Sequence, residues 1–224
     1  MIKNRTAQLI YLSMATAFGL VGAVASLGLF MYQLRWDFYI HFTNLSNYFC
    51  LAVLFAELIQ TARKKEDSCI SACPLLKFMG LLAILLTFIV FNVMLAPARE
   101  PSLNFTVNSI MLHVVMPILY ILDWFLFYER KKVKWYYPLY STLFPLCYTI
   151  FVFLHAAILK FDSSIRIENS TVPLIYPYFF LNLETQGVGG VLMWIGIIFV
   201  AFVSMGFIFF GIDKISKKKS QITE

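Results

Sequence analysis

Six long stretches of mostly apolar residues dominate this sequence and restrict what the chain can fold into. They cover about 8–33, 39–62, 74–97, 106–128, 136–159 and 187–211. A helix needs roughly 20 mostly apolar residues to cross ~30 Å of hydrocarbon, and each stretch is long enough. Transmembrane β-strands would instead show alternating segments of ~10 residues. The sequence therefore predicts an all-α, polytopic membrane protein with six transmembrane helices.

The composition of the 224-residue chain argues against a water-soluble globule of this size. It is 60% hydrophobic and only 13% charged, whereas a soluble domain is about a quarter charged. The chain contains no long linker, low-complexity run or convincing internal repeat, so we expect one six-helix transmembrane domain over residues 1–224. The first stretch lacks a small-residue cleavage site at the right distance, which predicts a retained helix and not a signal peptide.

The distribution of basic residues predicts the orientation. Six spans place both chain ends on one side, and 14 of the 18 Lys and Arg residues fall on that side. Cytoplasmic loops carry an excess of Lys and Arg, so we expect both termini to be cytoplasmic. The net charge of +6 then reflects topology, and no nucleic-acid partner is expected. The chain length and the lack of a long soluble domain favour a bacterial cytoplasmic membrane.

The cysteine pattern indicates neither a metal site nor a structural disulfide. Cys69 and Cys73 fall in a short cytoplasmic loop, where thiols normally stay reduced. Their C-x-x-x-C spacing has no further ligands beside it and is a poor zinc site. We expect no metal and no cofactor.

The segment FYIHFTNLSNYFC at residues 38–50 is unusually polar for the start of a transmembrane helix. Polar side chains within a membrane are costly and usually face an interior cavity. Residues three and four apart share a helix face, which aligns Thr43, Ser46 and Asn47 on one stripe. His41 lies about 200° round from Thr43 by the ~100° helical step, so we expect it to point elsewhere.

Polar residues of three further spans are predicted to reach the same depth, the outer third of the membrane. The second and fourth spans start at this depth, and the third and fifth end near it. The residues are Thr43, Asn44, Ser46 and Asn47 of the second span, Asn92 of the third, Ser109 and His113 of the fourth, and Tyr148 and His155 of the fifth. Ser, Thr and Asn also act as hydrogen-bonding contacts between membrane helices. Their convergence at one depth favours a functional cavity.

Two acids, Glu57 and Asp123, lie deeper, near the cytoplasmic ends of their helices. Asp123 is ten residues from His113, or ~15 Å along a helix, which is too far to orient that imidazole. We expect either acid to pair with Lys77 or to cap a cytoplasmic polar network. A proton path is the alternative.

Four short motifs carry a resemblance to a known family. FTNLSN begins the second span, LHVVMPILYILDWFLF lies in the fourth, WYYPLY begins the fifth and YPYFFLN precedes the sixth. Together they resemble the bacterial branch of the androgen-induced protein family of six-pass membrane proteins. The mammalian members of this family are intramembrane threonine hydrolases that cleave fatty-acid esters of hydroxy fatty acids, so the resemblance implies a hydrolase of this type. On motif position, its threonine and histidine fall on Thr43 and His113.

The chemistry of these two side chains fits nucleophilic acyl transfer. A threonine hydroxyl is a weak nucleophile until a base takes its proton, and neutral histidine is suited to that near pH 7. The tetrahedral intermediate needs hydrogen-bond donors for its oxyanion, for which we expect Asn47, with Asn44 or Ser46 as substitutes. Asn92, His155 or Tyr148 are the candidates to orient the dyad.

Three other functions fit the same pattern. An acyltransferase differs only in using an alcohol in place of water. A proton-coupled solute transporter would use His113, His155, Glu57 and Asp123 as a relay, and a lipid-binding sensor would have no turnover. Membrane lipids or acyl esters are the expected substrates.

The external loop at residues 161–186 contains the segment YPYFF near its end. We expect the aromatic rings of this segment to lie at headgroup depth and anchor the loop at the membrane interface. The alternative is that the segment acts as a lid.

Overall fold

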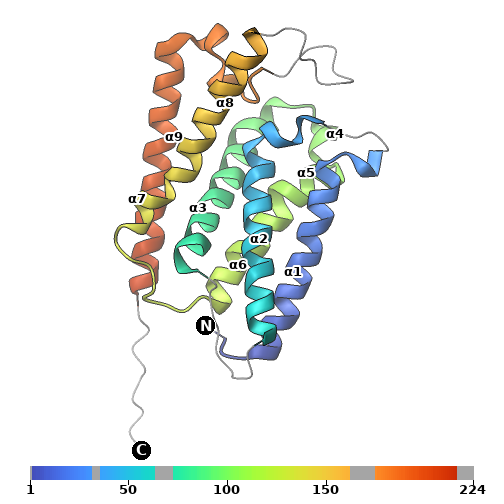
Figure 1. Cartoon of the computed structure of the whole chain (residues 1–224), viewed down its shortest axis with the longest axis vertical. Coiled ribbons are helices and arrows are strands. Elements are labelled where there is room, and N and C mark those ends of the chain that lie inside the picture. Colours follow the sequence, from blue (N-terminus) through green and yellow to red (C-terminus); the bar gives the residue numbers. More distant parts are fainter. Residues whose placement is uncertain (1, 32–35, 64–72, 162–174, 216–224) are drawn as a thin grey trace, which may run out of the picture.

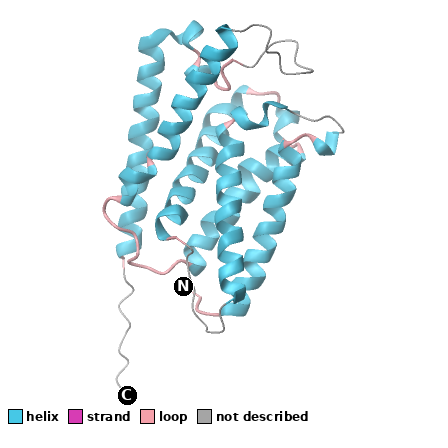
Figure 2. Ribbon diagram, in the orientation of Figure 1, coloured by secondary structure: helices cyan, strands magenta, loops and turns pink. Residues whose placement is uncertain are grey.

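The computed structural model describes residues 2–31, 36–63, 73–161 and 175–215. Every regular element in these ranges is helical, as Figure 2 shows. Six helices are long and apolar enough to cross a membrane: Arg5–Ser26, Phe42–Arg63, Pro74–Ala98, Val107–Phe127, Tyr137–Lys160 and Leu183–Lys214. The predicted all-α, six-span fold is confirmed. Cys69 and residues 162–174 of the loop at residues 161–186 lie outside the described residues.

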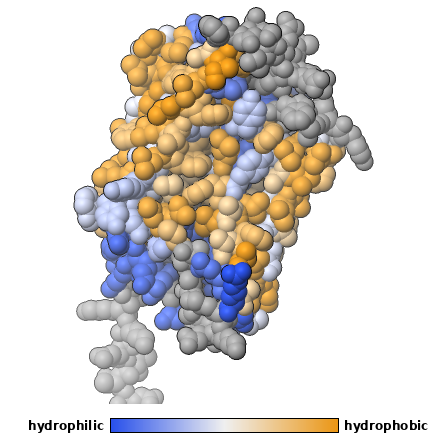
Figure 3. Space-filling view, in the orientation of Figure 1, coloured by the Kyte–Doolittle hydropathy of each residue, from blue (hydrophilic) through white to orange (hydrophobic). Residues whose placement is uncertain are grey.

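Both ends of the described chain lie at the same end of the bundle. Helix α1 (Arg5–Ser26) begins there and α9 (Leu183–Lys214) ends there, at the bottom of Figure 1. Hydrophilic side chains gather at this end, whereas hydrophobic side chains cover most of the middle of the visible face (Figure 3). We call this the termini end and the other the distal end.

Four helices form the centre of the bundle. Helix α1 packs along α2 (Phe42–Arg63), α2 packs against α3 (Pro74–Val90), and α6 (Met116–Phe127) packs against α1 and α3. Helices α7 (Tyr137–Ser141), α8 (Leu143–Phe161) and α9 lie on the outer side of α3 (Figure 1). A Cβ at Gly206 of α9 would stand 3.1 Å from the Pro138 Cα, so only glycine lets α9 approach α7 this closely.

Capping residues mark several helix boundaries. The Asn4 side chain accepts a hydrogen bond from the Ala7 N–H at the start of α1, and Asn182 accepts one from Glu184 at the start of α9. These bonds satisfy backbone donors that have no partner within the helix. Helix α1 ends earlier than the predicted first span, because Gly28 adopts a φ of 78°, which is incompatible with a continuing helix.

Two transmembrane spans contain a π-helical segment near the distal end. The third continues from α3 through the π-helical segment Phe91–Leu95 into the 3-10 turn Ala96–Ala98. After the short helix α4 (Pro101–Asn104), the fourth passes from α5 (Val107–Ile110) through the π-helical segment Met111–Val115 into α6.

Proline explains both distortions. Pro97 and Pro117 each follow a π-helical segment by two residues, and neither has a backbone N–H to continue the α-helical pattern. The residue before each proline donates to the carbonyl five positions back: Ala96 to Phe91, and Met116 to Met111. Single-turn π-helices are rare in proteins as a whole, and those that occur are often found at functional sites.

A buried ion network joins α2, α3 and α6. The Lys77 Nζ lies 2.5 Å from the Glu57 Oε2 and also pairs with Asp123, and all three residues are at most 2% exposed. Tyr120 lies beside them and donates a hydrogen bond to the Lys77 carbonyl (3.2 Å). Both acids therefore pair with Lys77. This pairing is one of the two roles that the sequence predicts for them.

Candidate functional site

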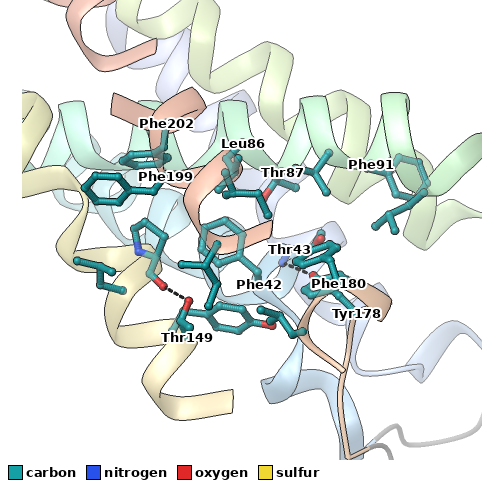
Figure 4. A pocket seen from close by; sticks show the side chains of 18 residues that line it. Phe42, Thr43, Leu86, Thr87, Phe91, Thr149, Tyr178, Phe180, Phe199 and Phe202 are labelled. Carbon is teal, nitrogen blue, oxygen red and sulfur yellow. Dashed lines mark hydrogen bonds between the residues drawn. The ribbon is translucent and has the colours of Figure 1, made fainter. Parts of the chain in front are cut away.

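Two cavities meet at Thr43, near the distal end of the bundle. One, of about 290 Å³, has a mixed lining with several charged and hydrogen-bonding side chains; we call it the polar cavity. The other, of about 80 Å³, is lined almost wholly by hydrocarbon; we call it the apolar cavity (Figure 4). Four residues line both cavities: Thr43, Phe91, Leu95 and Tyr178. These four form the wall between them.

The apolar cavity lies among α2, α3, α8, α9 and the 3-10 turn Phe179–Leu181. Phe199 and Phe202 of α9 and Leu86 of α3 extend into its lining, as Figure 4 shows. Leu146 and Phe199 also lie on the outer surface, where they are 38% and 39% exposed. In a membrane-spanning bundle that surface faces lipid, so this side of the cavity borders the hydrocarbon.

The polar cavity is lined by five separate parts of the chain. These are Ser26 at the end of α1, residues 37–44 before and within the first turn of α2, residues 91–99 at the end of the third span, residues 108–113 of the fourth span, and residues 177–179. Besides His113 and Tyr178, the ionisable side chains that line it are Asp37, His41 and Arg99. Arg99 is solvent-exposed and its guanidinium lies over the Phe91 ring, 5.7 Å from the centroid.

Thr43 is the second residue of α2 and is 8% exposed. Its backbone N–H belongs to the first turn, where N–H groups have no partner within the helix. It donates a long hydrogen bond (3.5 Å) to the Tyr178 hydroxyl, drawn in Figure 4. Thr43 thus stands at the positive end of the α2 dipole and lines both cavities.

His113 lies within the π-helical segment Met111–Val115 and is 9% exposed. Its Nδ1 lies 3.0 Å from the Ser109 carbonyl oxygen. A carbonyl can only accept, so Nδ1 carries the proton and Nε2 keeps a free lone pair. This tautomer is the one that a general base needs.

The His113 ring is held by the neighbouring span. It stacks on the Phe91 ring, with the centroids 3.5 Å apart and the planes at 13°. Because Pro117 cannot donate to the His113 carbonyl, that oxygen is left for another donor, and the Asn92 amide lies 3.5 Å from it. The stacked ring and the amide both belong to the π-helical segment Phe91–Leu95.

The structure does not bring Asn47 or Ser46 to either cavity, which corrects their assignment as oxyanion donors. The Asn47 amide nitrogen donates to the carbonyls of Thr43 (2.7 Å) and Leu112 (3.1 Å). Ser46 is fully buried and bonds to the Thr43 carbonyl and to the Thr87 hydroxyl. Both side chains link helices: Asn47 joins α2 to the fourth span through the Leu112 carbonyl, and Ser46 joins α2 to α3 through the Thr87 hydroxyl.

Asn44 lines the polar cavity, but its amide donates to the Phe38 carbonyl at 2.8 Å. Ser109 supplies the carbonyl that fixes His113, and its own hydroxyl does not line the cavity. Asn92 supports the His113 backbone from outside the lining. The structure therefore gives these three residues positioning contacts.

The fifth span was expected to line the same cavity as the second and fourth, and this is wrong. Tyr148 lines the apolar cavity and donates to the Ile40 carbonyl at 2.8 Å. His155 lines neither cavity, and its Nε2 lies 3.1 Å from the Tyr39 hydroxyl. Helix α8 stands on the far side of the wall from His113, so neither residue touches that imidazole.

Several residues of the site escaped the sequence analysis, among them Phe91, Arg99, His41 and Tyr178. His41 precedes α2, so the helical step that pointed it away does not apply, and it lines the polar cavity. Tyr178 belongs to the YPYFF segment, expected to anchor in the interface or form a lid, yet its hydroxyl reaches Thr43. The spacing of the sequence gives no sign of this contact, because 135 residues separate the two.

The described residues include no group of three or more His, Cys, Asp and Glu side chains that would hold a metal ion. The Thr43 hydroxyl and the His113 imidazole belong to residues that line the polar cavity, and the apolar cavity beside it is suited to a hydrocarbon chain. No family model, curated protein or solved structure matches this chain.

Proposed function

We propose that this chain is an intramembrane lipid-ester hydrolase acting on fatty-acid esters of hydroxy fatty acids, with Thr43 as nucleophile and His113 as general base. The observation that carries the proposal is the position of Thr43 in the wall between two cavities. Its neighbours on one side include His113, and on the other only hydrocarbon and a few hydroxyl groups. An ester at Thr43 has a polar part and an acyl chain, and each cavity suits one of them.

The reaction follows from the free lone pair on His113. As the Thr43 Oγ attacks the ester carbonyl carbon, the His113 Nε2 takes the hydroxyl proton. The tetrahedral intermediate collapses, the alkoxide leaves with that proton, and the acyl group remains on Thr43. Water from the polar cavity then gives a proton to His113 and attacks the acyl carbon. The products are a fatty acid and a hydroxy acid, and Thr43 recovers its proton.

Arg99 supports the choice of substrate. A fatty-acid ester of a hydroxy fatty acid keeps one free carboxylate, and the exposed guanidinium at the polar cavity is a cation for it. The acyl chain would lie in the apolar cavity, which borders the surrounding lipid. The substrates are therefore membrane lipids or acyl esters that enter from the bilayer.

The proposed setting is a bacterial cytoplasmic membrane with both termini in the cytoplasm. The positive-inside bias then places the distal end, and the site, toward the outer leaflet. Water reaches the acyl group from the outer surface through the polar cavity.

Purified protein should react with a fluorophosphonate probe and cleave a fatty-acid ester of a hydroxy fatty acid. Thr43→Ala and His113→Ala should each abolish both reactions, and the double variant should be no worse than either, since the pair acts as a unit. Thr43→Ser should keep part of the activity. Labelling of Thr43→Ala at the wild-type rate would overturn the threonine assignment. Acyl transfer to an added alcohol without hydrolysis would instead identify an acyltransferase.

A further inference from the structure

Tyr178 occupies a fixed position between the two cavities although it lies outside every long helix. It directly precedes the 3-10 turn Phe179–Leu181. Its ring stacks on the Phe180 ring, with the centroids 5.1 Å apart and the planes at 4°. The His41 ring makes a T-shaped contact with it, with the centroids 6.3 Å apart and the planes at 87°. These two ring contacts restrict rotation of the Tyr178 side chain, so its hydroxyl has a defined position.

The hydroxyl oxygen of Tyr178 accepts from a backbone N–H, which leaves its proton for a side-chain or substrate oxygen. The Thr43 N–H donates to this oxygen at 3.5 Å. A hydroxyl that accepts from a backbone N–H becomes a better donor, because hydrogen bonds in a chain polarise one another. Burial raises the pKa of the Tyr178 phenol, so the group stays protonated at neutral pH.

The neighbouring tyrosine cannot play the same part. Tyr148 lies beside Tyr178, and the two hydroxyls are within hydrogen-bond reach. The Tyr148 hydroxyl already donates to the Ile40 carbonyl at 2.8 Å, and a hydroxyl has one proton. Tyr148 therefore has no proton left for the substrate. In the resting state its oxygen accepts the Tyr178 proton, and that proton turns to the ester oxygen when substrate binds, so Tyr148 is a positioning residue.

The side-chain amides near Thr43 do not form part of the wall. Asn47 donates both N–H groups, to the carbonyls of Thr43 and Leu112, and lines neither cavity. Asn44 donates one N–H to the Phe38 carbonyl and lines the polar cavity but not the apolar one. Of the side chains that line both cavities, only Thr43 and Tyr178 carry a proton donor. Thr43 gives up its proton in the reaction, so Tyr178 is the donor that remains at the wall.

We propose that Tyr178 is a catalytic residue whose hydroxyl donates a hydrogen bond to the carbonyl oxygen of the ester as that oxygen becomes an oxyanion. This rests on the proposed function of Thr43. When the Thr43 Oγ bonds to the carbonyl carbon, the C=O π electrons move to the oxygen and the Tyr178 O–H stabilises them. The tyrosine keeps its proton, and the bond weakens again when the carbonyl re-forms.

The test compares Tyr178→Phe with Tyr176→Phe. Tyr176 lies two residues away and lines neither cavity, so its variant should match the wild type. Tyr178→Phe should lower kcat by about 10²- to 10³-fold, the usual cost of one oxyanion donor. Binding of a non-hydrolysable ether analogue should change less than threefold, since the ether has no developing oxyanion. Tyr148→Phe should give an intermediate loss of kcat.

A fluorinated tyrosine at position 178 guards against a folding defect. It keeps the ring and its packing but makes the hydroxyl more acidic, and it should change kcat while leaving binding of the ether analogue unaltered. Equal kcat for Tyr178→Phe and the wild type would overturn this assignment and leave the Thr43–His113 proposal standing. A wild-type protein that cleaves no ester would overturn the proposed function and this inference with it.

Discussion

The imidazole of His113 stacks on the ring of Phe91, with the centroids 3.5 Å apart and the planes 13° from parallel. Each residue lies in a π-helical segment, and the two segments belong to different transmembrane spans. A π-turn widens the helix by one residue, so the side chains on it point in directions that a regular helix would not allow. The stacking therefore depends on both proline-linked distortions at once.

Phe91→Leu should lower kcat while the protein stays folded. The substitution removes the flat surface that fixes the imidazole plane, and a misplacement of about 1 Å can cost up to ~100-fold in rate. We expect a loss of about 10- to 100-fold, measured as the rate of fluorophosphonate labelling. The matched control is Phe55→Leu, because Phe55 is 52% exposed and far along α2. Equal losses in the two variants would argue against a role for the stack.

Lys77→Met should destabilise the protein strongly. It leaves the buried carboxylates of Glu57 and Asp123 without their cation, which typically costs about 3–5 kcal/mol. Chemical denaturation in detergent would measure this loss. The control is Lys132→Met, whose pair with Glu129 is 52% and 54% exposed and contributes at most ~1 kcal/mol.

Neutralising the acids should restore part of that stability. Adding Glu57→Gln and Asp123→Asn to Lys77→Met removes the unpaired charges, so the triple variant should be more stable than Lys77→Met alone. Asp123→Asn by itself should reduce stability or expression more than the labelling rate of the folded fraction. A triple variant less stable than Lys77→Met would contradict the ion-network interpretation.

Ile198→Trp should shift the preferred acyl chain to shorter lengths. Ile198 lines the apolar cavity, and the larger ring fills space that we assign to the chain. Each buried methylene contributes about 0.8 kcal/mol, so excluding two of them should lower kcat/KM for long chains by more than about tenfold. Its neighbour Ile197 is 51% exposed on the other face, and Ile197→Trp should leave the chain-length profile unchanged. If Ile198→Trp and Ile197→Trp changed the dependence of kcat/KM on chain length in the same way, the acyl chain would not lie in the apolar cavity.

Arg99→Gln should raise KM for substrates with a free carboxylate. An exposed ion pair contributes up to ~1 kcal/mol, which corresponds to an increase of about fivefold. The methyl ester of the same substrate has no charge, and its KM should not respond to the substitution. The difference between the acid and its methyl ester should also shrink at high salt, because salt screens exposed charges. An equal effect on both substrates would exclude carboxylate recognition by Arg99.

The orientation can be tested with a cysteine placed on the distal side. Ser102 is exposed in the short helix α4, and a membrane-impermeant maleimide added to intact cells should modify Ser102→Cys. Native Cys73, at the start of α3, should react only after the membrane is opened. The reverse pattern would invert the topology and place the site on the cytoplasmic side.

The sequence by itself determined the class of fold and the level of the site. Whether a segment can cross ~30 Å of hydrocarbon depends on its own length and apolar content, which are local properties that can be read along the chain. The same holds for the depth of Thr43 and His113, because each span has a direction and a rise of ~1.5 Å per residue. Both residues line the polar cavity, as equal depth requires.

Only the tertiary structure decided which polar groups meet. Asn47 and Ser46 lie at the expected depth, but neighbouring backbone carbonyls take their donors. Helical spacing does not apply to His41, which precedes α2, or to Tyr178, whose hydroxyl arrives from a segment far along the chain. The wall between the cavities depends on how the π-helical segment Phe91–Leu95 and Tyr178 pack beside Thr43. Such packing joins residues distant in sequence, and no periodicity within a single helix encodes it.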